Sequence, residues 1–243
     1  MVAEHRIAGP PRITPFVGAV ILVNGAVFVL LRVLSAISYD TFELAGDAIY
    51  LTPSLVLRGW VWQIITHAFA HFDFLHIFLN MAILYIFGCR IENALGSRGF
   101  ARLYLFGALG SGALCVLVPF IPGLSASGDS FEVRVLGASG AIFAVCIAYA
   151  CMFPNDIIYV FLLVPMRAKW AAWLFVGVAF LGLISARTGI ANQAHLGGAL
   201  FGYIYYKWRI EARPPPGPGL FGRRKRRTGS YIDERFREIA KDL

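Results

Sequence analysis

Histidine and serine occur in this chain at positions where polar side chains are costly. Four of the five histidines lie in two apolar stretches, with His67, His71 and His76 in residues 64–88 and His195 in residues 191–208. Ser139 opens a third apolar stretch. Polar side chains inside such segments usually face a cavity or a partner. Histidine is also the usual base that activates a serine nucleophile, so these residues indicate acyl-transfer chemistry.

Ser139 and His195 are the pair best suited to that chemistry. Residues 137–140 (Gly-Ala-Ser-Gly) put the serine at the outer start of its segment. Taken alone, Ser139 has a simpler explanation, because small residues allow helices to approach closely. On a helix, His195 shares one face with Gly198 and Gly202, the face where another helix comes closest. No embedded Asp or Glu stands out as a third member, so a Ser–His dyad is predicted.

Neighbouring residues supply the supporting roles of such a site. Phe143 follows Ser139 by one helical turn, so its ring can stack on His195 and orient it. His76 and Asn80 lie one turn apart and carry N–H groups for an oxyanion, as does the Ser139 backbone. At 1.5 Å per residue, the serine and both histidines fall in the outer halves of their segments. We therefore predict one site formed by three segments.

The composition places these segments in a membrane. The chain is 58% hydrophobic and 15% charged, with a mean hydropathy of +0.67, whereas about a quarter of the residues of a soluble domain are charged. A helix needs about 20 apolar residues to cross a bilayer. We predict an all-α membrane protein, a bundle of six transmembrane helices. The predicted spans are Phe16–Ala36, Ile64–Gly88, Phe100–Phe120, Gly137–Phe153, Lys169–Ala186 and Ala191–Trp208.

The second span leaves the roles of His67 and His71 open. In a continuous helix turning about 100° per residue, these two histidines face away from His76 and Asn80. They are then dispensable for chemistry, and their hydrogen bonds anchor the preceding loop. Asp73 indicates an alternative in which the helix begins only after His71. Both histidines would then lie in or near that loop.

The distribution of basic residues predicts the topology. Six spans put both termini on one side, and most Lys and Arg residues fall on that side. The opposite side carries only Arg58, Arg134 and Arg187. By the positive-inside rule, we expect cytoplasmic termini in a multi-pass plasma membrane protein of a prokaryotic cell. The apolar stretch Asp156–Pro165 is too short to span and is predicted to be an interfacial segment between spans four and five.

The chain divides into a cytoplasmic N-terminal segment (1–15), the six-helix core (16–208) and a cytoplasmic C-terminal tail (209–243). Pro214–Gly219 is typical of a stiff linker, and the basic run Arg223–Arg227 follows it. That run is a topology determinant, and it also suits docking on anionic membrane lipid at about 1 kcal/mol per basic residue. A nucleic-acid partner is not expected. Apolar residues at helical spacing predict a short amphipathic helix, namely Ile232, Phe236, Ile239 and Leu243.

At these residues the chain resembles the rhomboid family of intramembrane serine proteases. Residues 137–140 are similar to the family's Gly-x-Ser-Gly nucleophile motif, and residues 194–202 to the His-and-glycine motif of its last core helix. The resemblance covers about Phe16–Trp208. One departure precedes the second span, where many members have Trp-Arg and this chain has Trp62-Gln63. The spacing of the family's second helix is reproduced by His67, His71, His76 and Asn80.

The resemblance implies a function as well as a fold. It makes Ser139 the nucleophile and His195 the base, with His76 and Asn80 in the oxyanion hole. It implies a six-helix bundle around a water-filled cavity open to the outside. The expected substrates are single-span transmembrane proteins, cut near the outer membrane surface, and no cofactor or metal is expected.

Two other classes of function use some of the same residues. A desaturase-type metal enzyme would take His67 and His71 as ligands, but such sites need many more histidines and usually carboxylates. A zinc peptidase would need the Glu of His-Glu-x-x-His, and Ala68 occupies that position. A non-catalytic binder of transmembrane helices would lack a reactive serine. Labelling of Ser139 by a fluorophosphonate excludes the binder, and loss of activity to chelators would indicate the metal enzyme.

Overall fold

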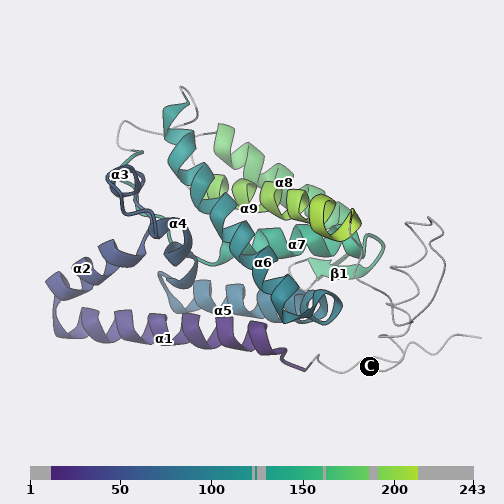
Figure 1. Ribbon diagram of the computed structural model, residues 1–243, viewed down its shortest axis with the longest axis horizontal. Helices are drawn as coiled ribbons and strands as arrows, with labels where there is room; N and C mark the ends of the chain where they lie inside the picture. Colours follow the sequence, from purple (N-terminus) through teal and green to yellow (C-terminus); the bar gives the residue numbers. More distant parts are fainter. Residues whose placement is uncertain (1–11, 122–123, 125–129, 161–162, 186–190, 213–243) are drawn as a thin grey trace, which may run out of the picture.

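The computed structural model of the chain describes residues 12–121, 124, 130–160, 163–185 and 191–212. Most of these residues are helical, and α1 begins at the same end of the bundle at which α9 ends (Figure 1). The predicted linker, basic run and amphipathic helix of the tail lie outside the described residues. The elements are α1 (Pro15–Ile37), α2 (Tyr39–Ile49), α3 (Pro53–Leu57), α4 (Gln63–Thr66), η1 (His67–Phe69), α5 (Phe74–Ile83), η2 (Leu84–Gly88), α6 (Cys89–Leu117), η3 (Val118–Phe120), α7 (Ser139–Met152), β1 (Ile157–Val160), β2 (Val164–Arg167), α8 (Ala168–Ile184), α9 (Ala191–Tyr205) and η4 (Tyr206–Glu211).

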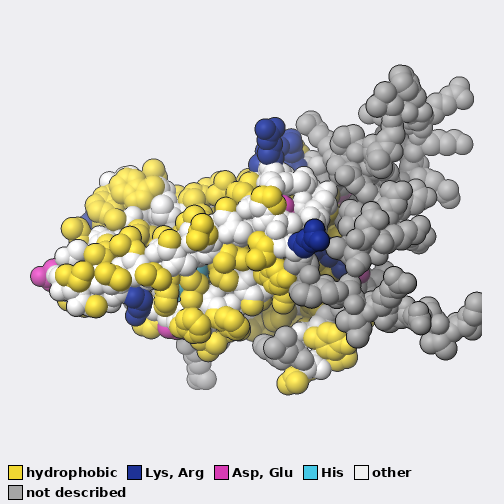
Figure 2. Space-filling view, turned by 90° about the horizontal axis from the view of Figure 1, so that it is seen from below, with side chains coloured by type: hydrophobic (Ala, Val, Ile, Leu, Met, Phe, Trp, Pro, Cys, Tyr) yellow, Lys and Arg dark blue, Asp and Glu magenta, His cyan; other side chains and the backbone are white. Residues whose placement is uncertain are grey.

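Two helical stretches in the described part of the chain are long and apolar enough to cross a membrane. They are Pro15–Ile37, with a mean hydropathy of 2.4, and Phe74–Phe120, with 1.9. Two further apolar helices, Ser139–Met152 and Ala168–Ile184, are shorter. Hydrophobic side chains are spread over the described part of the face seen in Figure 2, with few charged ones among them. The six-span count therefore stays a prediction, while the predicted helical character is confirmed.

The predicted second span is not one continuous helix. The chain turns through α4 and η1, leaves the helical conformation at Ala70, and resumes at α5. The Asp73 carboxylate accepts a hydrogen bond from the His76 backbone N–H at 2.8 Å, which caps the new helix. The interpretation based on an uninterrupted helix is therefore wrong, and the alternative that Asp73 indicates is the one observed.

The next reversal of the chain occurs at Gly96. This residue has φ 71° and ψ 160° within the stretch assigned to α6, a conformation that side chains disfavour. The helical stretch Phe74–Phe120 is therefore two segments that meet at a turn (Figure 1). This agrees with the predicted separation of spans two and three.

The first loop is docked by side-chain hydrogen bonds, and Gln63, at which the sequence departs from the expected pattern, makes two of them. Gln63 is fully buried, and its amide oxygen also accepts from the Thr52 backbone N–H at 3.0 Å. Side chains of this segment donate hydrogen bonds to the last carbonyls of α2, which have no partner within the helix. The pairs are Trp62 with the Ala48 carbonyl, Gln63 with the Asp47 carbonyl and Thr66 with the Ile49 carbonyl.

Glycines bring α6, α7 and α9 into backbone contact. A Cβ atom placed on Gly198 would collide with the Gly140 carbonyl, and one on Gly202 would lie 2.5 Å from the Ala144 Cα. A Cβ atom on Gly197 would likewise collide with the Gly110 carbonyl of α6. The predicted small-residue stripe of the last span therefore packs against the helix that Ser139 begins.

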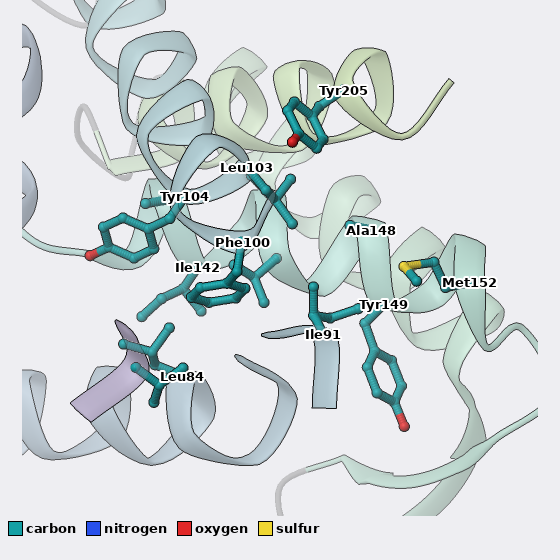
Figure 3. Packing of buried hydrophobic residues seen from close by; sticks show 14 of the residues in the cluster. Leu84, Ile91, Phe100, Leu103, Tyr104, Ile142, Ala148, Tyr149, Met152 and Tyr205 are labelled. Atoms are coloured by element: carbon teal, nitrogen blue, oxygen red, sulfur yellow. The ribbon is translucent and has the colours of Figure 1, made fainter. Parts of the chain in front are cut away.

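Large apolar side chains fill the bundle beyond this glycine contact (Figure 3). Phe100, Leu103 and Tyr104 of α6 are fully buried and lie near Ile142 of α7 and Leu84 of η2. The core thus ties η2, α6 and α7 together.

The segment predicted to lie at the interface connects α7 and α8. Residues 157–160 and 164–167 of it form the antiparallel hairpin β1–β2, and its interfacial location stays a prediction. Arg90 at the start of α6 pairs with Asp156 just before the hairpin at 2.7 Å. A short apolar run can be helix or strand, and here strand pairing satisfies backbone groups that a ten-residue helix would leave at its ends.

Glu92 anchors the start of α1 and gives the first testable prediction. Its buried carboxylate accepts hydrogen bonds from the Thr14 and Ser97 hydroxyls at 2.5 Å and from the Phe16 and Val17 backbone N–H groups at 2.9 Å. We expect Glu92→Gln to cost about 3 kcal/mol, because an amide cannot accept all four bonds.

The measurement is a thermal unfolding curve in detergent, where the Tm should fall by about 10 °C. The matched control is Glu132→Gln, since Glu132 is exposed and bonds only to the Ser54 hydroxyl among the interactions described for it. That variant should change the Tm by no more than about 2 °C. Equal Tm values for the two variants would contradict an anchoring role for Glu92.

Candidate active site

Ser139 and His195 meet at the end of the bundle where α7 begins. The Ser139 Oγ lies 2.9 Å from the His195 Nε2, which is hydrogen-bond distance. Ser139 is the first residue of α7, and His195 lies in the second turn of α9. Both side chains are half-buried. The predicted pair is therefore brought together by the same helices that Gly198 and Gly202 hold in contact.

Phe143 holds the imidazole in place. Its ring lies parallel to that of His195, with 4.3 Å between centroids and 5° between planes. Such a stack restricts the rotation of the histidine ring. This contact is the one expected from the one-turn spacing between Ser139 and Phe143.

His76 reaches the turn that precedes Ser139. Gly137 has φ +126°, and a Cβ atom added to it would lie 2.9 Å from both Cε1 and Nε2 of His76 and 3.7 Å from the Ser139 Oγ. Only glycine suits this backbone conformation and this distance. The absence of a side chain at Gly137 therefore lets the His76 imidazole lie next to the nucleophile turn.

Asn80 lies one turn along α5 from His76 and is buried. Its Nδ2 donates to the His76 carbonyl at 2.9 Å. A carboxamide carries two N–H hydrogens, and this bond within the helix uses one of them. The predicted oxyanion donors thus share one helix face, while Ser139 comes from α7.

The structure places His71 differently from the prediction. Its ring contacts that of His76, with centroids 4.9 Å apart and planes at 73°. Its Nε2 accepts a hydrogen bond from the Ala138 backbone N–H at 3.3 Å. The expectation that His71 faces away from His76 is therefore wrong, because the break before α5 removes the half-turn offset.

His67 has other partners. Its Nδ1 lies 3.0 Å from the Gln63 carbonyl, and its Nε2 lies 3.3 Å from the Ser111 hydroxyl of α6. His67 therefore bonds to α4 and α6, whereas His71 bonds to the turn before α7. The two side chains do not converge as a pair of metal ligands. In the described residues, no group of three or more His, Cys, Asp or Glu could hold a metal ion.

Ser111 is a site neighbour that sequence reasoning missed. It is fully buried between Gly110 and Gly112, and a Cβ atom on Gly140 would collide with its hydroxyl. Its pairing with His67 resembles the Ser139–His195 pair, but full burial removes it from any substrate. The signal available in the sequence is the Gly-Ser-Gly tripeptide inside the predicted third span.

Comparison with known proteins bears directly on this geometry. The family described as "Rhomboid domain" matches residues 58–211, which include Ser139, His195, His76 and Asn80. This chain belongs to the rhomboid family. The match spans more than half of the chain, and the family membership expected from the motifs is thereby confirmed.

Three curated rhomboid relatives illustrate the similarity. RHOMBOID-like protein 12, mitochondrial, of Arabidopsis thaliana is 31% identical over 195 residues, covering 74% of this chain and 54% of that protein. Rhomboid protein 1, mitochondrial, of Saccharomyces cerevisiae is 32% identical over 149 residues, covering 61% and 41%. Rhomboid-like protein 16, chloroplastic, of Arabidopsis thaliana is 29% identical over 171 residues, covering 67% and 50%. The chain thus spans about half the length of the relatives it matches.

These relatives correct the predicted location. The distribution of Lys and Arg leads to the expectation of a prokaryotic plasma membrane with cytoplasmic termini. The relatives are named as mitochondrial and chloroplastic proteins, which points to an organellar membrane. The positive-inside rule assigns a side relative to the compartment of synthesis. It carries no information about which membrane the protein occupies.

Proposed function

We propose that this rhomboid protein is an intramembrane serine endopeptidase that uses Ser139 and His195 as a catalytic dyad. The observation that carries the proposal is the 2.9 Å contact between the Ser139 Oγ and the His195 Nε2, with Phe143 stacked on the imidazole. A serine hydroxyl is a weak nucleophile until a base takes its proton. Here the base is within reach, and its ring is fixed.

The proposed reaction has two steps. In the first, the Ser139 Oγ attacks the scissile carbonyl carbon, and its proton passes to His195 Nε2. The tetrahedral intermediate collapses when His195 gives that proton to the leaving amine, which leaves an acyl-enzyme on Ser139. In the second, His195 takes a proton from water, the resulting hydroxide attacks the ester, and Ser139 recovers its proton.

The charge on the intermediate needs donors in the position of an oxyanion hole. We assign this role to the Ser139 backbone N–H, the His76 imidazole and the second Nδ2 hydrogen of Asn80. Ser139 begins α7, so its N–H has no intrahelical acceptor. The closeness of His76 to Gly137 supports its place beside that N–H.

The proposed substrates are transmembrane proteins with a single span. The dyad lies at one end of the bundle, close to the first turn of α7. A peptide bond reaching it must come from a helix that unwinds near that membrane surface, because regular helical carbonyls are shielded by their own hydrogen bonds. Cleavage near the surface at the Ser139 end follows.

The test is cleavage of a single-span model protein co-reconstituted with the enzyme in proteoliposomes. The wild type should release a soluble fragment at a site within about two turns of the membrane surface. A chelator should leave the rate unchanged. Absence of cleavage across a panel of such substrates, with the protein folded, would contradict the proposal and favour a binder of transmembrane helices.

The oxyanion donors give a second prediction in the same assay. His76→Ala and Asn80→Ala should each lower kcat by about 10²-fold, the usual cost of losing one such donor. Their Tm values should stay close to that of the wild type. Wild-type turnover in either variant would remove that residue from the oxyanion hole.

A further inference from the structure

We propose that His71 is a positioning residue that supports the oxyanion hole, because it holds both the Ala138 backbone N–H and the His76 ring. The proposal rests on the function proposed above. It adds a residue to the site at a position for which helical periodicity predicts no role in the chemistry.

Hydrogen bonds hold two successive backbone N–H groups in the turn before Ser139. The Gly137 N–H donates to the His67 carbonyl at 2.9 Å. The next N–H along the chain, that of Ala138, donates to His71 Nε2 at 3.3 Å. The third belongs to Ser139, whose N–H is the proposed oxyanion donor. Each peptide unit is planar, so once these two groups are fixed, the direction of the Ser139 N–H depends only on the backbone angles of Ala138, which are φ −70° and ψ −9°.

The second contact of His71 is with His76, another of the proposed oxyanion donors. Its ring meets the His76 ring edge to face, at 4.9 Å between centroids. His76 is half-buried and extends toward Gly137, whereas His71 is 1% exposed behind it. The buried His71 imidazole therefore packs against the His76 side chain. Through its hydrogen bond to the Ala138 N–H, it also positions the neighbouring Ser139 N–H. A shift of His71 would move two of the three proposed donors.

Packing alone does not account for a histidine here. Because Nε2 accepts from the Ala138 N–H, the ring proton lies on Nδ1. Nδ1 is buried and has no hydrogen-bond partner among the described residues. A buried donor without a partner destabilises the fold, and an apolar side chain would avoid that cost. The contact with Ala138 is what such a side chain could not provide.

The segment that carries His71 is fixed on both sides. Arg32 of α1 donates to the Phe72 carbonyl at 2.6 Å. Asp73 caps α5 by accepting from the His76 N–H at 2.8 Å. A charged side chain within an apolar helix is costly, and this bond gives Arg32 a specific partner. Helix α1 thereby braces the non-helical link on which His71 lies.

The experiment compares His71→Leu with His71→Gln in the proteoliposome cleavage assay. Leucine fills the space but has no acceptor, whereas the glutamine amide oxygen can replace Nε2. We expect His71→Leu to lower kcat about tenfold with KM changed less than about twofold, because a small displacement of a donor acts on the transition state. His71→Gln should recover most of kcat.

Controls separate positioning from stability. Glu92 lies at the opposite end of the bundle from the dyad. The variant Glu92→Gln is therefore expected to lower the Tm and to keep wild-type kcat in the folded fraction. Arg32→Met removes the bond to the Phe72 carbonyl and should lower kcat, as His71→Leu does. Arg32→Lys keeps a donor and should lower kcat less. Equal kcat losses in His71→Leu and His71→Gln, or wild-type kcat in folded His71→Leu, would overturn the proposal. Lack of cleavage by the wild type would instead contradict the proposed function.

Discussion

Replacing Ser139 with alanine is expected to reduce cleavage of a transmembrane substrate by at least about 10⁴-fold, and His195→Ala should do the same. Each change removes one half of the 2.9 Å contact between Oγ and Nε2. Alanine leaves the glycine-lined contact between α7 and α9 intact, so both variants should insert and purify like the wild type. The measurement is kcat with reconstituted enzyme.

The double variant distinguishes a dyad from two independent residues. Members of one catalytic unit are not additive, so Ser139→Ala/His195→Ala should be no slower than either single variant. A further large loss in the double variant would show that the two residues act separately. Retention of more than a trace of activity in either single variant would contradict the assignment.

Gly198→Val is the second change with a large expected effect. Even a Cβ atom at Gly198 would collide with the Gly140 carbonyl, one residue past Ser139. Helix α7 must then move away from α9, and a displacement of about 1 Å can cost on the order of 10²-fold in rate. We expect kcat to fall by at least that factor, measured on the folded fraction.

Two glycines provide the controls for this steric effect. Gly202 packs on Ala144, one turn further from the dyad, so Gly202→Val should lower the Tm more than it lowers kcat. A Cβ atom added to Gly25 of α1 would have no heavy atom of another described segment within 4 Å, and Gly25→Val should behave like the wild type. Full activity in Gly198→Val would show that α7 and α9 can separate without loss of the dyad.

Spacing in the sequence, together with the chemistry of a serine and a histidine at similar depths, is enough to predict the contact between Ser139 and His195. Helical periodicity puts His195 on the same face as Gly198 and Gly202, and small residues mark the faces where helices approach closely. The position of Phe143 follows from its one-turn offset. These inferences need only regular helices, and α7 and α9 are regular over the residues concerned.

The parts that could not be predicted depend on contacts between distant segments. The link at residues 70–73 is held by Arg32 of α1 and by Ala138 before α7, neither of which a local pattern reveals. The Asp73 cap is the one local sign of a break. The hairpin of β1 and β2 escapes prediction because a short apolar run has no diagnostic period. Ser111 escapes it because its partner, His67, lies 44 positions away.

Covalent labelling by a fluorophosphonate probe tests the central claim most directly. The probe should add to the wild-type protein once, and peptide mass spectrometry should place the adduct on Ser139. Labelling should disappear in Ser139→Ala and be strongly slowed in His195→Ala, because the serine needs its base. An adduct on another residue, or equal labelling of the wild type and His195→Ala, would contradict a Ser139–His195 dyad.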